Sequence, residues 1–256
     1  MFFMAAPEHY SISVYGTKDI AARYDLSHFS DEIGQYIHDQ DVSAIACEAS
    51  SSYEVVADVG TGTGRIASGI RQAGMGLHSR IIGIDASRVM LCAAEKRDPR
   101  IILLRADAHA LPMPDRFADL TVCFRVLMYS PDPVRLIDEL ARISGNAVVL
   151  DFSSTRSVAY LHSCLRKMMA CFRKCTQAFR TFTFRQIDEM FARNGFAVRR
   201  ISGRFVLPVF LHRCLARHLG IEAAIAVDHF FQRHLTQFSS SITIVAERRK
   251  QVGTRE

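Results

Sequence analysis

Short apolar blocks alternate with amphipathic blocks along the first 150 residues of the chain. The short blocks are almost continuously apolar, which is typical of strands, and in the amphipathic blocks apolar residues return every three or four positions, which is typical of helices. We predict strands at 54–60, 80–85, 101–107, 118–125 and 146–153, and helices at 65–74, 87–97 and 132–144. This alternation favours right-handed crossover connections and a mostly parallel sheet.

A further helix is expected before the first strand, at residues 18–40. Its apolar positions recur at steps of three and four with polar residues between them: Leu26, Phe29, Ile33 and Ile37. We therefore expect residues 1–50 to form a helical cover over a core made by residues 51–153.

The pattern changes after residue 153. We predict a long helix at 155–180, a helix at 183–196, late strands at 198–207 and 241–249, and a His- and Arg-rich helical insertion at 209–236. The predicted fold class is α/β: a Rossmann-like, doubly wound, mostly parallel seven-stranded sheet with helical cap insertions after the fifth strand. We expect a single domain over 1–256, with the cap helices and late strand elements in 154–236 and the last strand in 237–247.

Composition excludes several protein classes. The chain has 256 residues, of which 49% are hydrophobic and 23% are charged, as in ordinary globular proteins. No apolar run approaches the ~20 residues that span a bilayer. Residues 1–10 lack the basic start of a secretion signal. The seven cysteines are an odd number without a CxxC pair, so we expect reduced, mostly buried thiols and a cytoplasmic protein.

Charge divides the chain into an acidic and a basic part. Residues 1–150 hold 14 Lys and Arg against 19 Asp and Glu, and residues 151–256 hold 18 against 7, which together give the net charge of +6. A basic half suits an anionic substrate, a phosphate-bearing carrier, a membrane surface or nucleic acid, but a solvated basic face without function gives the same count.

Glycines occupy every second position after the first predicted strand, in the stretch VADVGTGTGRIA. Gly60, Gly62 and Gly64 follow Asp58, and a helix is predicted from Arg65. A strand, a glycine loop and a helix in this order allow backbone N–H groups to face a polar or anionic ligand at close range. A tight turn without a ligand would have the same spacing.

The next two predicted strands each end in an acidic residue, and these two residues indicate which kind of ligand the site binds. Asp85 lies 21 residues after Gly64, where an acid can accept both hydroxyls of a ribose. Asp107 and Ala108 follow the third strand, where a carboxylate and a backbone N–H can recognise adenine. A dinucleotide requires GxGxxG, whereas this loop reads GxGxGR, and Asp58 would repel phosphate but suit an ammonium. Ribose, adenine and an ammonium together describe S-adenosylmethionine (SAM).

The ordered motifs resemble those of the class I SAM-dependent methyltransferases, in the small-molecule branch (methyltransferase type 11) that includes quinone-biosynthesis C-methyltransferases. The resemblance rests on VADVGTGTGRIA, IIGIDAS and RADAHALPMPDRFADLTVCFRVLMYSPDPVRLIDELARI. It is close over about residues 15–155 and loose over 183–247. Such motifs are specific for fold and cofactor but say little about substrate.

The resemblance implies a role for each matching residue. Asp58, Gly60, Thr61, Gly62 and Gly64 would hold the methionine end of SAM, Asp85 and Ala86 the ribose, and Asp107 and Ala108 the adenine, while Phe124 and Arg125 would line the pocket near the sulfonium. The sequence CFRV stands where enzymes that methylate DNA amines have Asp or Asn followed by two prolines and an aromatic residue, which argues against methylation of a nucleobase amine.

Methyl transfer from a sulfonium is an in-line displacement in which the protein aligns the acceptor, and no metal is required. The candidate catalytic residues are His28 and His109, as general bases, and Tyr129, near the expected acceptor mouth with Arg125. Each also has a purely structural explanation. The helical-region histidines at 212, 218, 229 and 234 are spaced by 6, 11 and 5, which misses the i,i+4 spacing of helix-borne zinc ligands.

The sequence therefore predicts a SAM-dependent methyltransferase that acts on a small-molecule or lipid-like acceptor, which the basic half suggests is anionic. The basic face of 155–180 has two interpretations, a solvated cap helix or peripheral contact with an anionic membrane. Two other functions stay open: an RNA or protein methyltransferase that uses the basic half, and a non-catalytic SAM-fold partner protein. No nucleic-acid module supports the RNA alternative. The oligomeric state is left undetermined by the sequence.

Overall fold

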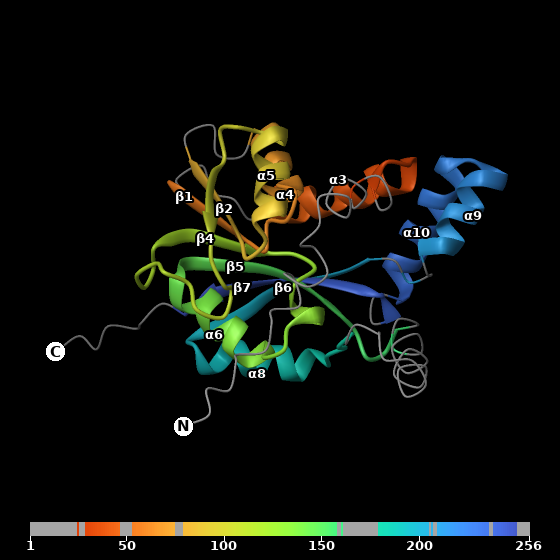
Figure 1. Cartoon of the computed structure of the whole chain (residues 1–256). Coiled ribbons are helices and arrows are strands. Elements are labelled where there is room, and N and C mark those ends of the chain that lie inside the picture. Colours follow the sequence, from red (N-terminus) through yellow and green to blue (C-terminus); the bar gives the residue numbers. More distant parts are fainter. Residues whose placement is uncertain are drawn as a thin grey trace, which may run out of the picture. The chain divides into compact units, whose positions relative to one another are not determined.

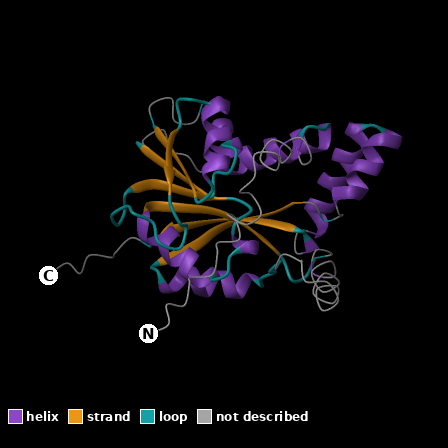
Figure 2. Cartoon of the chain, viewed as in Figure 1, coloured by secondary structure: helices purple, strands orange, loops and turns teal. Residues whose placement is uncertain are grey.

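A computed structural model gives the structure of the chain. It describes residues 25, 29–46, 53–74, 79–157, 160, 179–204, 206, 209–235 and 238–249. Seven strands form one sheet in the order β3-β2-β1-β4-β5-β7-β6. Helices flank the strands (Figures 1 and 2). The predicted fold class is confirmed: the sheet is mostly parallel and Rossmann-like.

The chain divides into two compact units, Met1–Pro112 and Met113–Glu256. In the first unit, three parallel strands pair in register: β1 (Val55–Val59), β2 (Arg80–Asp85) and β3 (Ile102–Arg105). Its helices are α3 (Glu32–Ala46), α4 (Arg65–Gln72) and α5 (Arg88–Arg97). The β1 strand is buried along its whole length, so this unit has its core around β1.

In the second unit, β4 (Ala118–Cys123) and β5 (Ser144–Ser153) are parallel, and β7 (Ser241–Arg248) runs antiparallel to both β5 and β6 (Phe196–Arg204). The helices are the 3-10 turn η1 (Leu127–Tyr129), α6 (Pro133–Ile143), α8 (Phe184–Arg193), α9 (Val209–Leu219) and α10 (Ile221–Leu235). The helices α6 and α8 pack beside each other, against β5 and β6 respectively (Figure 1). The α9–α10 pair is inserted between β6 and β7.

Capping residues explain where several helices begin. The Ser87 hydroxyl accepts the Met90 N–H at the start of α5, and Asp132 accepts the Arg135 N–H ahead of Pro133 at the start of α6. Thr183 and Gln186 form a reciprocal capping box on α8. These caps lie within one or two residues of the predicted helix starts.

The N-terminal helical region ends later than predicted. The sequence pattern suggested 18–40, whereas α3 spans Glu32–Ala46 and follows a bend at Ser30 and Asp31. Asp25 and Phe29 are also helical, and the rest of 18–28 lies outside the described residues. The carboxylate of Asp31 accepts the Gly34 N–H at 2.8 Å and so caps the helix immediately before Glu32. Most of the predicted helix at 155–180 lies outside the described residues. At its edges, residues 155–157 form a turn, and Ser154 forms an isolated bridge with Phe182.

Three cysteines lie in the described part of the chain, and all three are free thiols. Cys123 is buried, but Cys92 and Cys214 are exposed, so the expectation of mostly buried thiols is wrong for these residues. Both exposed cysteines lie on amphipathic helices, where the apolar pattern did not reveal which face the thiol occupies. Of the described helices, none combines the length and apolarity needed to cross a membrane.

Candidate cofactor site

Asp58 is an acid inside the first unit, on β1 one residue before its end. Its side chain is 1% exposed. The carboxylate accepts a hydrogen bond from the Thr61 hydroxyl at 2.8 Å, and the Ala67 N–H at the start of α4 also hydrogen-bonds it. Burial nevertheless raises the pKa of Asp58 to about 6, because desolvation outweighs these two hydrogen bonds and the nearby charge of Arg65. A cation brought to this carboxylate would favour its ionised form.

The glycine loop turns its own N–H groups inward. Gly60, Gly62 and Gly64 have φ of 76°, 56° and 74°, in the left-handed region that favours glycine. The Gly60 and Thr61 N–H groups donate to the Ile84 carbonyl, and the Gly64 N–H donates to the Thr61 carbonyl. The expectation that these N–H groups face an anionic ligand is therefore wrong, because the loop uses them to hold its own shape. The bare Cα atoms, rather than the amides, are what this loop offers to a ligand.

Thr61 supports Asp58 and packs against the neighbouring strand. It is 6% exposed, and a Cβ added to Gly83 on β2 would lie 3.0 Å from its hydroxyl oxygen. Gly83 therefore leaves the space in which the Thr61 side chain lies. The hydroxyl is directed to Asp58, so the structure places Thr61 as a residue that positions this acid.

Asp85, at the end of β2, is hydrogen-bonded to the glycine loop. Its Oδ2 accepts the Gly62 N–H at 2.9 Å and its Oδ1 accepts the Ser87 N–H at 2.8 Å. Burial raises its pKa in spite of these bonds. The Ala86 N–H is a third backbone donor to this carboxylate. A carboxylate has about four acceptor sites, so three backbone bonds leave capacity for one ligand hydroxyl. The carbonyl of the adjacent Ala86 accepts a hydrogen bond from Arg105 Nε at 3.0 Å.

Asp107 and His109 form a local turn after β3. Asp107 Oδ1 accepts the His109 N–H at 2.8 Å and lies 2.9 Å from His109 Nδ1, and the His109 side chain is buried. The Asp107 carbonyl accepts the Ala110 N–H, which closes the turn over Ala108. The imidazole thus holds the acid that was expected to recognise adenine.

The N-terminal segment is attached to the glycine loop through Asp25. The Thr63 hydroxyl donates to Asp25 Oδ1 at 2.9 Å, and Asp25 also pairs with the Arg97 guanidinium. Arg97 Nε in turn donates to the Thr63 carbonyl at 2.9 Å. Nothing local in the sequence indicates this arrangement, since Thr63 and Asp25 are 38 positions apart.

A second polar attachment joins α3 to the start of α4. Arg65 is 8% exposed and pairs with buried Asp41 at 2.9 Å, while its Nη1 lies 2.9 Å from His38 Nδ1 and its guanidinium lies over the Phe29 ring. Because arginine only donates, His38 Nδ1 must accept, and His38 is therefore neutral. Burial, and then the Arg65 charge, lower the pKa of His38.

The two helices approach closely at Gly69 of α4. A Cβ added at Gly69 would lie 2.4 Å from Val42 Cγ2 and 2.8 Å from His38 Cε1, both on α3. Only glycine fits there, so α3 is fixed on α4 by shape as well as by charge.

The residues predicted after β4 belong to the second unit. Phe124 is buried, and the Arg204 guanidinium lies 5.7 Å from the centroid of its ring. Arg125 has a φ of 61°, and its backbone N–H donates to the buried Asp151 carboxylate. Tyr129 packs edge-on against Phe179.

The structure thus brings together Asp58, the loop glycines and Asp85 in the first unit. His28 lies outside the described residues. Sequence reasoning missed the supporting residues Asp25, His38, Asp41, Thr63, Gly83 and Arg97. In the part of the chain that the structure describes, no group of His, Cys, Asp and Glu side chains could hold a metal ion.

Comparisons with known proteins agree with this geometry. Residues 57–147 match the model of the methyltransferase domain family. An uncharacterized methyltransferase of Mycobacteroides abscessus is 33% identical over 105 residues, which cover 38% of this chain and 39% of the relative. The demethylmenaquinone methyltransferase of Thermotoga maritima is 37% identical over 102 residues, covering 38% and 43%. The chain thus spans about two fifths of these curated relatives.

A solved structure extends the likeness to most of the fold. The magnesium protoporphyrin IX methyltransferase ChlM of Synechocystis PCC 6803, crystallised with bound SAH, superposes with a TM-score of 0.63 at 16% identity, over 93% of this chain and 97% of that one. At this identity the likeness concerns the fold. The family match over residues 57–147 covers the end of β1, the glycine loop and β2, which hold Asp58 and Asp85, and the fold is similar to that of this methyltransferase.

Proposed function

We propose that this protein transfers a methyl group from SAM to a small-molecule or lipid-like acceptor. The observation that carries the proposal is the pair of acids on adjacent strands, Asp58 and Asp85, which are joined through one glycine loop. Thr61 of the loop binds Asp58, and Gly62 of the loop binds Asp85. The two carboxylates are therefore held as one unit.

The residues present suit SAM, whose sulfonium supplies the methyl group when the cofactor is bound. Asp58 would attract its ammonium, which offsets the unfavourable burial of the carboxylate. Asp85 would accept a ribose hydroxyl with its remaining acceptor site. Asp107 and Ala108, in the turn held by His109, would contact adenine. The charge of Asp58, the acceptor capacity of Asp85 and the bare backbone of the glycine loop would thus each contact a different part of SAM.

The acceptor side of the reaction rests on the second unit. Phe124 and Arg125 would border the reacting centre, and Tyr129 would contact the acceptor. The Asp107 contact favours a supporting role for His109 over that of general base, which leaves His28 as the candidate base. The names of the relatives favour a quinone-like or porphyrin-like small molecule as acceptor. A cytoplasmic location remains part of this proposal.

Calorimetry with SAM tests the cofactor assignment, and the variant Asp85→Asn tests the ribose contact. We expect SAM affinity to fall about 10- to 100-fold, the effect of losing charge-assisted hydrogen bonds of about 1.5–3 kcal/mol. Asp119→Asn, on β4, serves as a control and should bind SAM as the unchanged protein does. Equal affinity in the Asp85 variant would show that the ribose assignment is wrong.

Methyl transfer is then measured with isotope-labelled SAM against lipid extracts, quinone and porphyrin compounds, RNA and protein. Label in the small-molecule or lipid fraction supports the proposal. Salt-sensitive labelling of RNA, or labelling of protein, would favour the macromolecular alternative. A folded protein that fails to bind SAM would point to a non-catalytic partner subunit.

A further inference from the structure

A cavity of about 240 Å³ opens on the second unit, at the end of the sheet where strands β4 and β5 begin. It is lined by Asp115, Arg116, Ala141, Arg142, Asn194 and Arg248. Three of these six residues are arginines and one is an acid. Phe124 and Arg125 lie at the opposite end of the sheet, where β4 ends. The cavity is therefore separate from the acceptor residues of the proposed methyl transfer.

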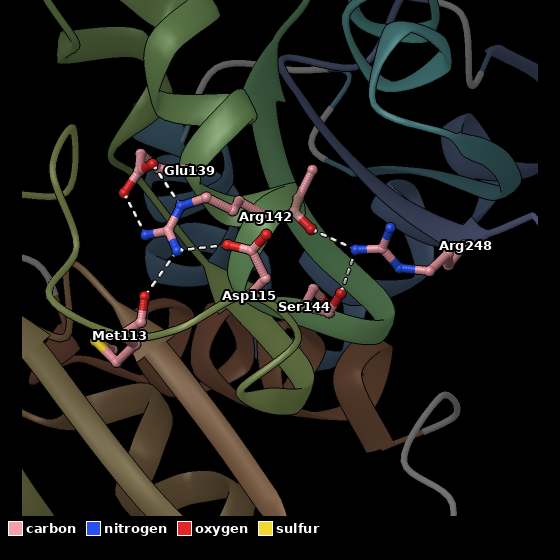
Figure 3. Close-up of polar contacts among 7 residues, drawn as sticks. Met113, Asp115, Glu139, Arg142, Ser144 and Arg248 are labelled. Atoms are coloured by element: carbon pink, nitrogen blue, oxygen red, sulfur yellow. Dashed lines mark hydrogen bonds and ion pairs between the residues drawn. The ribbon is translucent and has the colours of Figure 1, made fainter.

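One of the three arginines is matched by acids. Arg142 forms two hydrogen bonds with Glu139, at 2.8 and 2.9 Å, and its Nη1 lies 3.0 Å from Asp115 Oδ1 and 2.7 Å from the Met113 carbonyl (Figure 3). These partners raise the pKa of Arg142. Its charge is already balanced, so Arg142 contributes shape and donors rather than net charge.

Arg248 is held without an acid. Its Nη2 donates to the Ala141 and Ser144 carbonyls at 2.8 and 2.6 Å (Figure 3). Its Nε donates to the Gly145 carbonyl, and the guanidinium lies over the Phe196 ring. Among the described residues it forms no ion pair with a carboxylate. The carbonyls at the end of α6 fix its position and leave Nη1 for another acceptor.

Arg116 supplies a second cation without an acidic partner in the described part of the chain. It is exposed and has a φ of 56°, and its N–H donates to the Arg142 carbonyl at 2.8 Å. Burial lowers the pKa of Arg248 most, and the charge of Arg116 lowers it further, so the two guanidinium groups repel each other. Two like charges converging on one cavity repel in the absence of an anion.

We propose that this cavity binds the phosphate group of a soluble small molecule, held by Arg116 and Arg248. Arg116 offers a guanidinium fork, which matches phosphate oxygens with two parallel hydrogen bonds, and Arg248 offers its Nη1. Three arginines against Asp115 and Glu139 leave an excess of one positive charge, and both acids are engaged by Arg142. The ligand class is a phosphomonoester or diphosphate, and the site acts independently of the candidate cofactor site.

The test is calorimetric titration with inorganic phosphate and with pyrophosphate, at low salt and in the presence of saturating S-adenosylhomocysteine. The variant Arg116→Gly removes the cation and accepts the positive φ, so it keeps the fold. We expect saturable binding at one site and at least a ten-fold loss of affinity in the variant. Arg185→Ala, which removes an exposed arginine of α8, is the matched control and should bind as the unchanged protein does.

Three results would overturn the proposal. One is the absence of saturable binding of either anion. Another is an equal loss in the Arg116 and Arg185 variants, which would indicate general attraction to a basic surface. The third is retention on phosphatidylcholine vesicles containing phosphatidic acid that Arg116→Gly abolishes, without binding of the free anions, which would assign the cavity to a lipid headgroup. The cofactor titration is separate, so its failure leaves this test valid.

Discussion

Asp58 holds a carboxylate at a place where water does not reach it, and its protonation therefore depends on what the site contains. Its pKa lies at about 6 in the folded chain, against 3.8 as the ordinary value. The raised pKa means that the folded state favours the protonated acid. The ionisation of Asp58 consequently lowers the free energy of unfolding as pH rises from about 4 to about 6, and above pH 6 the whole of this loss is present.

The variant Asp58→Asn should be more stable than the unchanged protein at pH 8, by on the order of 2–3 kcal/mol, because it removes this cost. At pH 4 the difference should vanish. Urea unfolding at pH 4, 6 and 8 measures it. Asp98→Asn provides a control of opposite sign, since hydrogen bonds from Arg100 lower the pKa of Asp98. The same Asp58 variant should bind SAM more weakly. An Asp58→Asn protein that is less stable than the unchanged protein at pH 8 would contradict this account.

Single residues also mark the limit of what the sequence could predict. Asp58, the loop glycines and Asp85 were identified because they lie at the ends of recognisable strands. Arg65 and Asp41 are 24 positions apart, and nothing local indicates that they pair. The direction of the loop N–H groups was predicted wrongly, because it depends on the Ile84 carbonyl, which belongs to another strand.

Among the described helices, α3 is one whose position depends on buried charge. Arg65 and Asp41 form its ion pair with α4, and removal of one partner of a buried pair leaves the other charge unpaired. His38 must stay neutral to accept from Arg65. Its lowered pKa means that the docking contributes full stability above about pH 6.5 and loses it as pH falls below that value.

The variant Asp41→Asn should therefore loosen α3, at a cost of about 3 kcal/mol. Hydrogen exchange should show faster exchange in α3 and no change in α8. In the unchanged protein, lowering the pH from 7.5 to 5.5 should reduce the protection of α3, after correction for the intrinsic pH dependence of exchange. Equal loss of protection in α3 and α8 would mean that the pair supports the whole fold instead.

The ends of strands and helices were predictable where a run of apolar residues, or a helix-capping residue, marks them in the sequence. The strand at 80–85 was predicted with its bounds, and α6 within one residue, because Asp132 and Pro133 mark its start. The bend and cap at Asp31, ahead of α3, were missed because the apolar positions Leu26 and Phe29 continue the helical spacing across it.

At the scale of the whole molecule, the division of charge between the two halves suggests contact with an anionic surface. Exposed apolar and basic residues lie together on α9 and α10: Leu219 is 68% exposed and Phe230 is 61% exposed, and Arg217 and Arg233 are exposed near them in sequence. An amphipathic surface of this composition binds anionic lipid through both apolar burial and charge.

We expect anionic vesicles to retain the protein at low salt and to release it at high salt, since salt screens exposed charges. Phe230→Ser should weaken retention, whereas Phe184→Ser, which changes an exposed phenylalanine of α8, should not. Cosedimentation measures both. Absence of retention at low salt would remove the membrane interpretation.

The inward-facing amides of the glycine loop bear on how a ligand associates. A loop whose donors are already satisfied keeps its shape in the free protein, so binding does not have to order it. The entropic cost of association then falls on the ligand and on the side chains that meet it, rather than on the loop backbone.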